Sequence, residues 1–334
     1  MTAQRKILEV ENLSIGFLPE NQIFVDQVSF FLEEGEILGI CGESGSGKSI
    51  TALSLLNLLP ENAFSSGKIL YQGHEIQDYT EREWQKIRGK EIAMVFQDQQ
   101  AALNPTMRVG QQIAEVWEIQ AKEISHTESE RAVVELLDNL GLTCPGLVAD
   151  AFPHELSGGM RQRIGLAMAF AGEANIIICD EATTALDISL QEKILGLLKR
   201  QRAEAGSSII FISHDIRLMW ELCDRVLIFY AGEIVETGTV DELKAQPAHP
   251  YTKSMLAAMP SGDKRGADLP EIPGRVPGAA ELAEMKKGVK PCLFSNRCPR
   301  AKALCFQSTP EFASLSPKHQ ARCHFAEEVY LERG

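Results

Sequence analysis

The N-terminal part of the chain alternates apolar and polar positions in the segments LEVENLSIGF and QVSFFLEEGEILGICG. Alternation with a period of two is typical of half-buried strands, and the Gly and acidic residues between them favour turns. Two later segments, ANIIICDEA and SSIIFISHD, are short apolar runs rich in β-branched residues that stop at acidic or His residues. Such runs are typical of parallel strands buried on both faces. The pattern predicts a β-rich start and a buried parallel sheet whose strands end in polar residues.

Helical patterns lie between these strands. The segment ITALSLLNLL, residues 50–59, is helical in composition and precedes Pro60, which cannot continue a helix interior. From about residue 111 to 142 the chain has helix formers, apolar positions spaced by about 3.6 residues and a Gly at the end, which predicts a helical subdomain at about residues 100–160. After about residue 246 the composition turns to Pro, Gly and Cys. We therefore expect a main domain at 1–245 and a C-terminal extension at 246–334.

Composition narrows the class of protein. The apolar fraction of 44% suits a sizeable core, and no apolar run approaches the roughly 18 residues needed to span a bilayer. The first residues lack the apolar region of a secretory signal, so we expect the chain to stay in the cytoplasm. Lys and Arg number 33 against 46 Asp and Glu, and the net charge of -13 opposes a broad contact with a phosphate backbone. No nucleic acid partner is expected.

A glycine-rich motif follows the first apolar strand pattern and precedes a helical pattern, which is the context that G-x-x-x-x-G-K-[ST] requires. Its glycines let successive backbone N–H groups curl around an anion. Lys48 would reach the β- and γ-phosphates of a nucleotide, and the Ser49 hydroxyl would bind Mg²⁺. A Gly/Ser turn that happens to carry a Lys is the alternative. The predicted ATP-binding residues of this loop are Gly42, Glu43, Ser44, Gly45, Ser46, Gly47, Lys48 and Ser49.

Two acidic residues, Asp180 and Glu181, follow the apolar run Ile176–Cys179 at the end of a predicted strand. Phosphoryl transfer needs a carboxylate that holds the metal, and Asp180 is predicted to supply it. Glu181 is the next residue and points elsewhere at the strand end, so it is placed to orient or deprotonate an attacking water as general base. A solvated acidic turn is the alternative, which the phosphate-loop motif upstream disfavours.

The residues Leu156, Ser157, Gly158, Gly159 and Met160 open a predicted helix, with Ser157 in the capping position and two glycines exposing backbone N–H groups. This is a second anion-binding helix start. Here the sequence resembles the ATP-binding-cassette (ABC) family of ATPases, whose signature motif reads LSGGQ or LSGGM, and the likeness extends from about residue 5 to 245. The resemblance implies an α/β fold, a P-loop NTPase of ABC type with an antiparallel β subdomain, a helical subdomain and a C-terminal Cys-rich extension.

The resemblance also implies roles for single residues. Gln97 matches the Q-loop glutamine, which contacts the metal or water and senses the transporter. Asp187, in Thr184-Ala185-Leu186-Asp187, matches the D-loop that links two active sites. His214 matches the switch histidine that bonds the γ-phosphate, and Phe17 stands where the family has an aromatic that stacks on adenine. The implied catalytic residues are Glu181, His214 and Gln97, and the implied Mg²⁺ ligands are Ser49, Gln97 and Asp180.

Two residues depart from the family's pattern. Ala182 stands where a proline usually follows the catalytic Glu, and Gln99 stands where a proline is common after the Q-loop. Neither replacement removes a chemical group, so we expect them to affect local backbone freedom and rate rather than mechanism.

In this family the signature motif of one subunit covers the ATP held by the phosphate loop of another. A single chain therefore carries two incomplete half-sites, and turnover requires a dimer. ATP then joins two domains and hydrolysis releases them, a cycle that a membrane partner can use.

The C-terminal extension has a motif of its own. His249-Pro250-Tyr251-Thr252, followed by Leu256-Ala257-Ala258-Met259-Pro260, resembles the extension of ATPases from oligopeptide, dipeptide and nickel importers.

Four of the eight cysteines crowd into this extension as C-x₅-C-x₆-C-x₁₇-C: Cys292, Cys298, Cys305 and Cys323. Four thiolates can ligate zinc or a [4Fe–4S] cluster, and the absence of the paired C-x₂-C spacing of a zinc ribbon favours the cluster. The resemblance implies an iron–sulfur cluster at these positions, and zinc or free thiols are the alternatives. A cluster would staple a Pro-rich segment that has too few apolar residues to fold alone. The other four, Cys41, Cys144, Cys179 and Cys223, are expected to be buried small hydrophobic residues.

These features predict an ATP-binding and ATP-hydrolysing subunit of a bacterial ABC importer for di- or oligopeptides or a related solute such as nickel. The expected cofactors are ATP, Mg²⁺ and a [4Fe–4S] cluster, with zinc as the alternative. The implied partners are a second ABC ATPase subunit in a heterodimer, two membrane permeases and an external solute-binding protein. The chain would be a peripheral protein on the cytoplasmic face of the inner membrane.

Two other functions are compatible with parts of the sequence. A soluble ABC ATPase could act on nucleic acid or the ribosome, but such proteins have long coiled-coil insertions or two cassettes per chain, and this chain has neither. A regulatory module that does not hydrolyse ATP is disfavoured because Lys48, Asp180, Glu181 and His214 are all present.

Overall fold

The computed structural model describes residues 5–120, 125–183, 186–259, 271–285, 287 and 290–332. The chain divides into two compact units. Unit 1 comprises Met1–Ile7, Leu32–Ile37 and Asp78–Ser213, and unit 2 comprises Leu8–Phe31, Leu38–Gln77 and His214–Gly334. Thr184, Ala185 and Pro260, which belong to motifs identified in the sequence, lie outside the described residues. We call the described residues from 271 onward the tail.

Unit 1 contains three parallel strands in the order β6, β7, β8. Their bounds are Ile92–Val95, Ile176–Asp180 and Ser208–Ser213. Every residue of β7 and β8 is buried, because β-branched side chains fill both faces of the sheet. The two apolar runs therefore form buried parallel strands, as the pattern predicts, and Asp180 ends the central strand β7.

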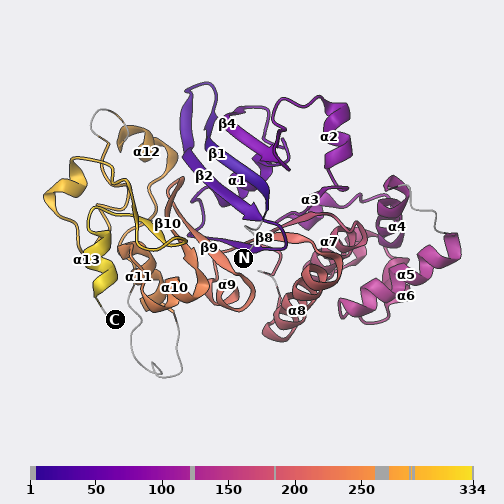
Figure 1. Ribbon diagram of the computed structural model, residues 1–334. Helices are drawn as coiled ribbons and strands as arrows, with labels where there is room; N and C mark the ends of the chain where they lie inside the picture. Colours follow the sequence, from indigo (N-terminus) through magenta and orange to yellow (C-terminus); the bar gives the residue numbers. More distant parts are fainter. Residues whose placement is uncertain are drawn as a thin grey trace. The chain divides into compact units, whose positions relative to one another are not determined.

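Helices make up the rest of unit 1, and their packing can be followed in Figure 1. Helices α4, α5 and α6 contact one another, and α4 and α5 also contact α7. The region predicted as helical at 111–142 contains two helices, of which α5 starts at a capping box where Ser125 and Glu128 exchange hydrogen bonds. The bounds are α2 Glu81–Ile87, α3 Gln99–Ala102, α4 Val109–Ile119, α5 His126–Asn139, α6 Pro145–Ala149, η1 Pro153–Glu155, α7 Gly158–Ala171 and α8 Ile188–Ala205.

An antiparallel sheet with the strand order β2-β1-β4-β5 contributes to unit 2. Its strands span Gln22–Glu33, Lys6–Phe17, Ala63–Tyr71 and His74–Glu75. Buried and exposed residues alternate over much of β2, which is the pattern expected for a sheet with one buried face. The β-rich start and the antiparallel β subdomain are thus confirmed.

A second group of strands in unit 2 includes two strands of the tail. Strand β3 (Ile37–Cys41) runs parallel to β9 (Arg225–Tyr230), and β10 (Glu233–Thr239) runs antiparallel to β9. The tail then adds β12 (Gln320–Arg322) to the edge of β10, and β11 (Phe312–Ser314) pairs with β12. The tail therefore extends the sheet that β3, β9 and β10 form.

The first helix of unit 2 is shorter than predicted. Helix α1 spans Lys48–Ser54, so it starts two residues before the predicted segment 50–59 and ends well before Pro60. Leu55 and Leu56 are buried in the turn that follows, and Asn57 adopts a left-handed conformation with φ of 52°. The buried turn is built from leucines, so the segment has the amino-acid composition of a longer helix although α1 ends at Ser54.

The other helices of unit 2 are short. They are α9 Ile216–Leu222, α10 Val240–Ala245, α11 Pro250–Ala257, α12 Ala279–Met285, η3 Ala303–Phe306 and α13 Ala326–Leu331. Among the described residues, none of the helices has both the length and the apolar character that crossing a membrane requires.

Candidate functional site

The phosphate loop, residues 42–49, connects β3 to α1 in unit 2, and its shape depends on glycine. Gly47 has φ of 102°, a conformation that side chains with a Cβ atom rarely adopt. A Cβ atom on Gly42 would lie 2.2 Å from the backbone oxygen of Phe229 in β9, so the loop packs directly on the neighbouring strand. The backbone at both positions therefore requires the glycines that the motif predicts.

Lys48 lies inside this loop. Its Nζ atom donates hydrogen bonds to the backbone oxygens of Gly42 and Glu43, each at 2.9 Å, and its side chain is buried. The loop thus curls around an ammonium group close to where a nucleotide phosphate would bind. Ser49, at the start of α1, is half-buried.

His214 lies beside the phosphate loop within unit 2. An open cleft of about 490 Å³ is lined by His214 together with Gly42, Glu43 and Ser44 of the loop. The His214 side chain is exposed, and the following residue, Asp215, caps α9 by accepting the Arg217 N–H at 2.9 Å. The structure therefore brings the predicted switch histidine and the predicted phosphate loop to one cleft.

Phe17, the last residue of β1, packs edge-to-face against Phe24 of β2, with ring centroids 6.2 Å apart. The Phe24 ring in turn lies 3.9 Å from the position that a Cβ atom would take on Gly47. The half-buried Phe17 ring is thus one residue away from the phosphate loop, which is compatible with the predicted contact to adenine.

In unit 1, Gln97 and Glu181 meet at the ends of β6 and β7. Gln97 Nε2 donates to Glu181 Oε2 at 3.2 Å. Glu181 has φ of 49°, and it is held there because its N–H donates to the Ile212 oxygen and its own oxygen accepts from Gln162 Nε2, both at 3.0 Å. Asp180 is 3% exposed, so its carboxylate is removed from water at the strand end.

The signature residues form a capped helix start in unit 1. Leu156 is buried, Ser157 and Gly158 are exposed, and Gly159 and Met160 are half-buried. Ser157 Oγ accepts the Met160 N–H at 3.3 Å, which is the predicted capping contact at the start of α7. Gln162 of the same helix reaches the Glu181 backbone, so the signature helix and the predicted general base are directly connected.

Asp187 caps the next helix, α8. Its carboxylate accepts from Ser189 Oγ at 2.8 Å and from the Leu190 N–H at 3.0 Å. These two hydrogen bonds lower the pKa of Asp187, because they stabilise the charged carboxylate. The exposed aspartate is therefore fixed in direction by the helix that it starts.

Of the two residues that depart from the family's pattern, Gln99 has a local explanation in the structure. Gln99 is buried in unit 1, and its side chain fills the space over Gly165 of α7, where a Cβ atom would lie 2.2 Å from Gln99 Oε1. Ala182 is fully buried. Glutamine and glycine thus form a matched contact in place of the proline.

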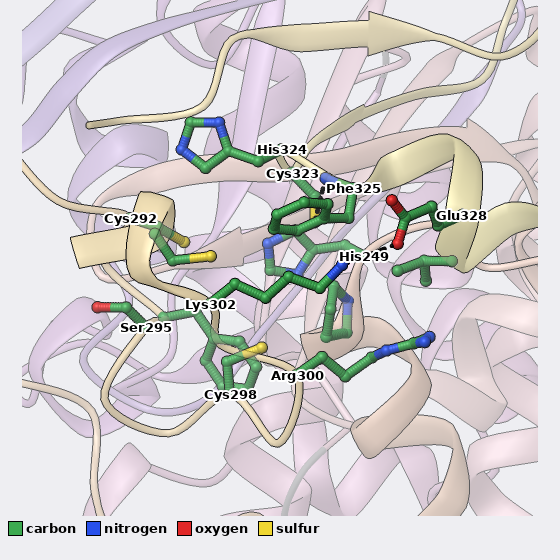
Figure 2. Close-up of a pocket in the computed structure, with 14 residues that line it drawn as sticks. His249, Cys292, Ser295, Cys298, Arg300, Lys302, Cys323, His324, Phe325 and Glu328 are labelled. Atoms are coloured by element: carbon green, nitrogen blue, oxygen red, sulfur yellow. Dashed lines mark hydrogen bonds and ion pairs between the residues drawn. The ribbon is translucent and has the colours of Figure 1, made fainter. Parts of the chain in front are cut away.

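The four cysteines of the tail line one cavity in unit 2, which we call the cysteine cavity. Figure 2 shows Cys292, Cys298 and Cys323 around this space, and Cys305 also lines it. Burial is the main cause that raises the pKa of Cys292 to about 12 and that of Cys323 to about 11. In the described part of the chain, no group of three or more His, Cys, Asp or Glu side chains is arranged to hold a single metal ion.

Groups around the cysteine cavity suit negatively charged sulfur. Cys323 Sγ accepts the Phe325 N–H at 3.5 Å, and backbone hydrogen bonds from Phe294 and Arg300 lower the pKa values of Cys292 and Cys298 against the effect of burial. Arg300 and Lys302 also line the cavity. Backbone N–H donors and cations stabilise thiolates, so these groups favour the charged form of the cysteines against the effect of burial.

One prediction about the remaining cysteines is wrong. Cys41, Cys179 and Cys223 are buried, as expected, but Cys144 is exposed. It caps α6 with φ of 55°, in a turn that precedes Pro145 rather than in an apolar run.

Sequence reasoning missed a contact between the tail and the phosphate loop. Arg297 forms an ion pair with Glu43, and Tyr251 accepts the Glu43 N–H through its hydroxyl oxygen. Arg297 stands directly before Cys298, and Glu43 lies in the phosphate loop. Their unlike charges are compatible with an ion pair, but 254 positions separate them, so the sequence alone does not indicate the contact.

Comparison with known proteins identifies the family of the chain. The family model "ABC transporter" matches residues 25–184, and the model "Oligopeptide/dipeptide transporter, C-terminal region" matches residues 235–305. The oligopeptide transport ATP-binding protein OppD of Bacillus subtilis (strain 168) is 42% identical over 323 residues, which are 95% of this chain and 88% of that protein. The dipeptide transport ATP-binding protein DppD of Lactococcus lactis subsp. cremoris is 41% identical, over 96% of this chain and 91% of that protein.

A solved structure is also similar. The dimeric ATP-binding cassette MJ0796, in a post-hydrolysis state bound to ADP and Pi, matches with a TM-score of 0.63 and 27% identity, covering 70% of this chain and 98% of that chain. The fold is thus that of an ABC-type P-loop NTPase. Taken with the two relatives, this shows that the chain belongs to the ABC transporter ATPases of the oligopeptide and dipeptide transport family, which hydrolyse ATP for transport.

Proposed function

We propose that this chain is the ATP-hydrolysing subunit of a bacterial peptide importer, on the cytoplasmic face of the cell membrane. The observation that carries the proposal is the presence, in one chain, of a complete phosphate loop and a C-terminal region of the oligopeptide/dipeptide type. Relatives named as oligopeptide and dipeptide transport proteins match over nearly the whole chain, which supports di- or oligopeptides as the solute. Nickel is the alternative solute.

In the proposed reaction, Lys48 binds the β- and γ-phosphates and Glu181 takes the proton of the attacking water. The hydrogen bond from Gln97 to Glu181 Oε2 supports this role, because it orients the carboxylate. His214 would bond the γ-phosphate, and Phe17 would stack on adenine. Ser49, Gln97 and Asp180 would hold Mg²⁺, which neutralises phosphate charge when bound. Asp180 supports this assignment because it ends the buried strand β7, and phosphoryl transfer needs a carboxylate at such a strand end to hold the metal.

We also propose that Leu156–Met160 and Asp187 act on ATP held by a second ATPase subunit. The exposed Ser157 and Gly158 support this, because they leave the start of α7 open to a partner. The similar cassette MJ0796 is a dimer, which supports the same arrangement. We propose a sister ATPase as the second subunit, two permeases in the membrane and an external solute-binding protein.

For the extension, residues 246–334, we propose a [4Fe–4S] cluster held by Cys292, Cys298, Cys305 and Cys323. The four thiols line one cavity, and backbone N–H groups of Phe294, Arg300 and Phe325 donate to three of the sulfur atoms, which supports a centre held by thiolates. The lack of the paired C-x₂-C spacing of a zinc ribbon favours the cluster over zinc. The cluster would supply a crosslink among four segments of the tail. Zinc is the alternative.

The test is ATP hydrolysis and peptide uptake by the full chain assembled with its cognate ATPase, permeases and binding protein in vesicles. Replacing Glu181 by Gln keeps the shape and removes the base, so we expect kcat to fall at least about 100-fold while ATP still binds. Glu192→Gln, on the exposed face of α8, is the matched control and should hydrolyse ATP normally. Unchanged hydrolysis in Glu181→Gln would exclude Glu181 as the base.

The same vesicles test the solute. ATP-dependent uptake of a labelled dipeptide or oligopeptide, lost in Lys48→Ala, is the expected result. Uptake of nickel without any uptake of peptide would contradict the peptide assignment.

A further inference from the structure

Glu43 is bound by the tail at its carboxylate, by α11 at its backbone N–H and by Lys48 at its backbone oxygen. Arg297 Nη1 and Nη2 donate to Glu43 Oε1 and Oε2 at 3.0 and 3.1 Å, a two-pronged ion pair. The Glu43 N–H donates to the hydroxyl oxygen of Tyr251 at 3.1 Å. The Glu43 backbone oxygen accepts from Lys48 Nζ at 2.9 Å. One residue thus connects the tail and α11 with the predicted phosphate-binding lysine, all within unit 2.

The Arg297 side chain is held on several sides. It is 7% exposed, its Nε donates to the Pro273 oxygen at 2.7 Å, and its guanidinium carbon lies 5.6 Å from the centre of the Tyr230 ring. Exposed ion pairs contribute little because water screens them and both side chains lose freedom. This pair differs, since the arginine is already fixed and largely shielded before it meets Glu43.

Aromatic packing fixes the groups around the pair. The rings of Tyr230, Tyr251 and Phe294 contact one another, with centroids 4.8 to 5.4 Å apart. Phe294 comes from the tail and lines the cysteine cavity, Tyr230 ends β9 and Tyr251 lies in α11. His249, which begins the motif of Tyr251, caps α11 by accepting the Tyr251 N–H at 3.1 Å. The motif of the extension therefore holds the tyrosine against the phosphate loop.

Arg297 compensates the negative charge of Glu43, which would otherwise face a bound phosphate. A loop that binds triphosphate should repel it less when it carries no uncompensated carboxylate. Glu43 lines the cleft beside the loop and its side chain is one third exposed, so its charge would act on a bound phosphate. Arg297 neutralises this charge and, through the same contact, fixes the backbone oxygen that Lys48 uses.

We propose that Arg297 is a positioning residue of the nucleotide site: it acts through Glu43 to keep the phosphate loop in its binding shape and to compensate the loop's negative charge. This inference rests on the proposed role of residues 42–49 in ATP binding. The tail is then part of the ATP site's support as well as an appendage. Arg297 contacts the phosphate loop through the Glu43 carboxylate, so its effect on the loop depends on Glu43.

The test is a double-mutant cycle on the purified full-length chain, with the Kd for MgATP measured by calorimetry at fixed ionic strength. We expect Arg297→Met to raise the Kd about tenfold, which corresponds to about 1.4 kcal/mol. In a Glu43→Gln background the same replacement should raise the Kd less than about twofold, because no carboxylate remains to be held or neutralised. Arg297→Lys keeps the charge but not the two-pronged contact, so it should give an intermediate Kd.

Two controls separate the possible failures. Arg275→Met removes another arginine of the tail, one paired with Glu281 at an exposed position, and should leave the Kd unchanged. Lys48→Ala should abolish binding. If Lys48→Ala binds MgATP like the unaltered chain, the proposed ATP site is wrong. The role of Arg297 is then excluded as well, but because the site is wrong and not because the contact with Glu43 has no effect.

The inference itself is overturned if Arg297→Met is folded and binds MgATP with an unchanged Kd, since the pair would then only fasten the tail. An equal loss of affinity in both backgrounds would also overturn it, because Arg297 would not act through Glu43. Should Arg297→Met not fold, Arg297→Lys and Glu43→Gln decide: an unchanged Kd for Arg297→Lys in both backgrounds contradicts the proposal.

Discussion

All six residues of β9 are buried and strands pair with it on both sides, whereas the two strands of the tail have three residues each. Where β11 and β12 meet, the small core consists of Ala248, Ala321 and Ala326 with a few partly buried neighbours. Both regions belong to unit 2. The central residues of β9, Val226 to Phe229, are apolar and fully buried, whereas the tail relies on buried ion pairs, aromatic rings and the cysteine cavity.

This difference has a functional side. The tail, although poor in apolar core, supplies Arg297 to the phosphate loop. A change that loosens the tail should therefore alter nucleotide binding, whereas a small side-chain change in the core of β9 that leaves its backbone in place should alter stability alone.

The largest effect is expected at the cysteines. Cys305 is 6% exposed, and Cys305→Ser would remove one of the four proposed cluster ligands and leave a buried hydroxyl in the cavity. We expect loss of bound iron and sulfide and rapid proteolytic cleavage within residues 290–332, because metal binding and folding are coupled. Iron and sulfide analysis with mass spectrometry of limited digests measures both. Cys144→Ser, at an exposed position, is the matched control.

Unchanged proteolysis of Cys305→Ser would show that the tail folds without the cysteine cavity, and the contrast with β9 would be lost. Stoichiometric zinc without iron or sulfide in the unaltered chain would replace the cluster by zinc.

The next largest effect is expected at Glu236 of β10. Its fully buried carboxylate accepts hydrogen bonds from the Ala248 N–H at 2.6 Å and from the His249 N–H at 3.0 Å. It also pairs with His319 Nε2 at 2.8 Å. Glu236→Ala would orphan these groups, so we expect a loss of about 3–5 kcal/mol in the free energy of unfolding of unit 2. Urea unfolding followed by tryptophan fluorescence measures it.

The matched control for Glu236→Ala is Glu332→Ala, which breaks an exposed pair with Arg300 and should cost less than about 1 kcal/mol. Equal losses in the two variants would show that burial adds nothing to the ion pairs of the tail.

A smaller effect concerns pH. Burial lowers the pKa of His249 to about 4, with the carboxylate of Glu236 acting in the opposite direction. The unfolded chain binds a proton at this residue below about pH 6.5, but the folded chain does so only near pH 4, so stability falls as the pH falls between these values. From pH 7 to pH 5 we expect His249 to account for a loss of about 2 kcal/mol.

His249→Asn is the matched variant, since Asn also caps helices but does not titrate. Urea unfolding at both pH values should show a smaller loss of stability on acidification for this variant than for the unaltered chain. The same loss in both proteins would mean that other groups cause the acid sensitivity.

The smallest effect is expected in β9. Ile228 is fully buried, and Ile228→Val removes one methylene group from a well-packed strand. We expect a loss of about 0.5–1.5 kcal/mol in the free energy of unfolding, with the Kd for MgATP unchanged. A weaker Kd for MgATP in this variant would remove the distinction between β9 and the tail.

Sequence reasoning succeeded where the signal is local. The buried strands β7 and β8 are continuous apolar runs, and the glycines of residues 42–47 are dictated by the backbone of the loop itself. It is less accurate after Ser54, because the buried leucines of that turn have the composition of a helix but do not form one. It also failed for Cys144, where a turn beside a Pro overrides the preference of cysteine for the core.

The contact between Glu43 and Arg297 could not be predicted from spacing, because 254 positions separate the two residues. Only the packing of the tail against α11 and β9 brings them together, and no periodic pattern records that packing. Unlike charges in two separate motifs were compatible with such a contact but were no argument for it.

The most direct test of the tail's role is amide hydrogen exchange of residues 43–47 in the unaltered chain and in Arg297→Met, with residues 226–229 of β9 as the internal reference. We predict faster exchange in the phosphate loop of the variant and equal exchange in β9, because the contact that fixes Glu43 is lost while the strand keeps its neighbours. Equal exchange of residues 43–47 in both proteins would contradict the claim that the tail holds the loop.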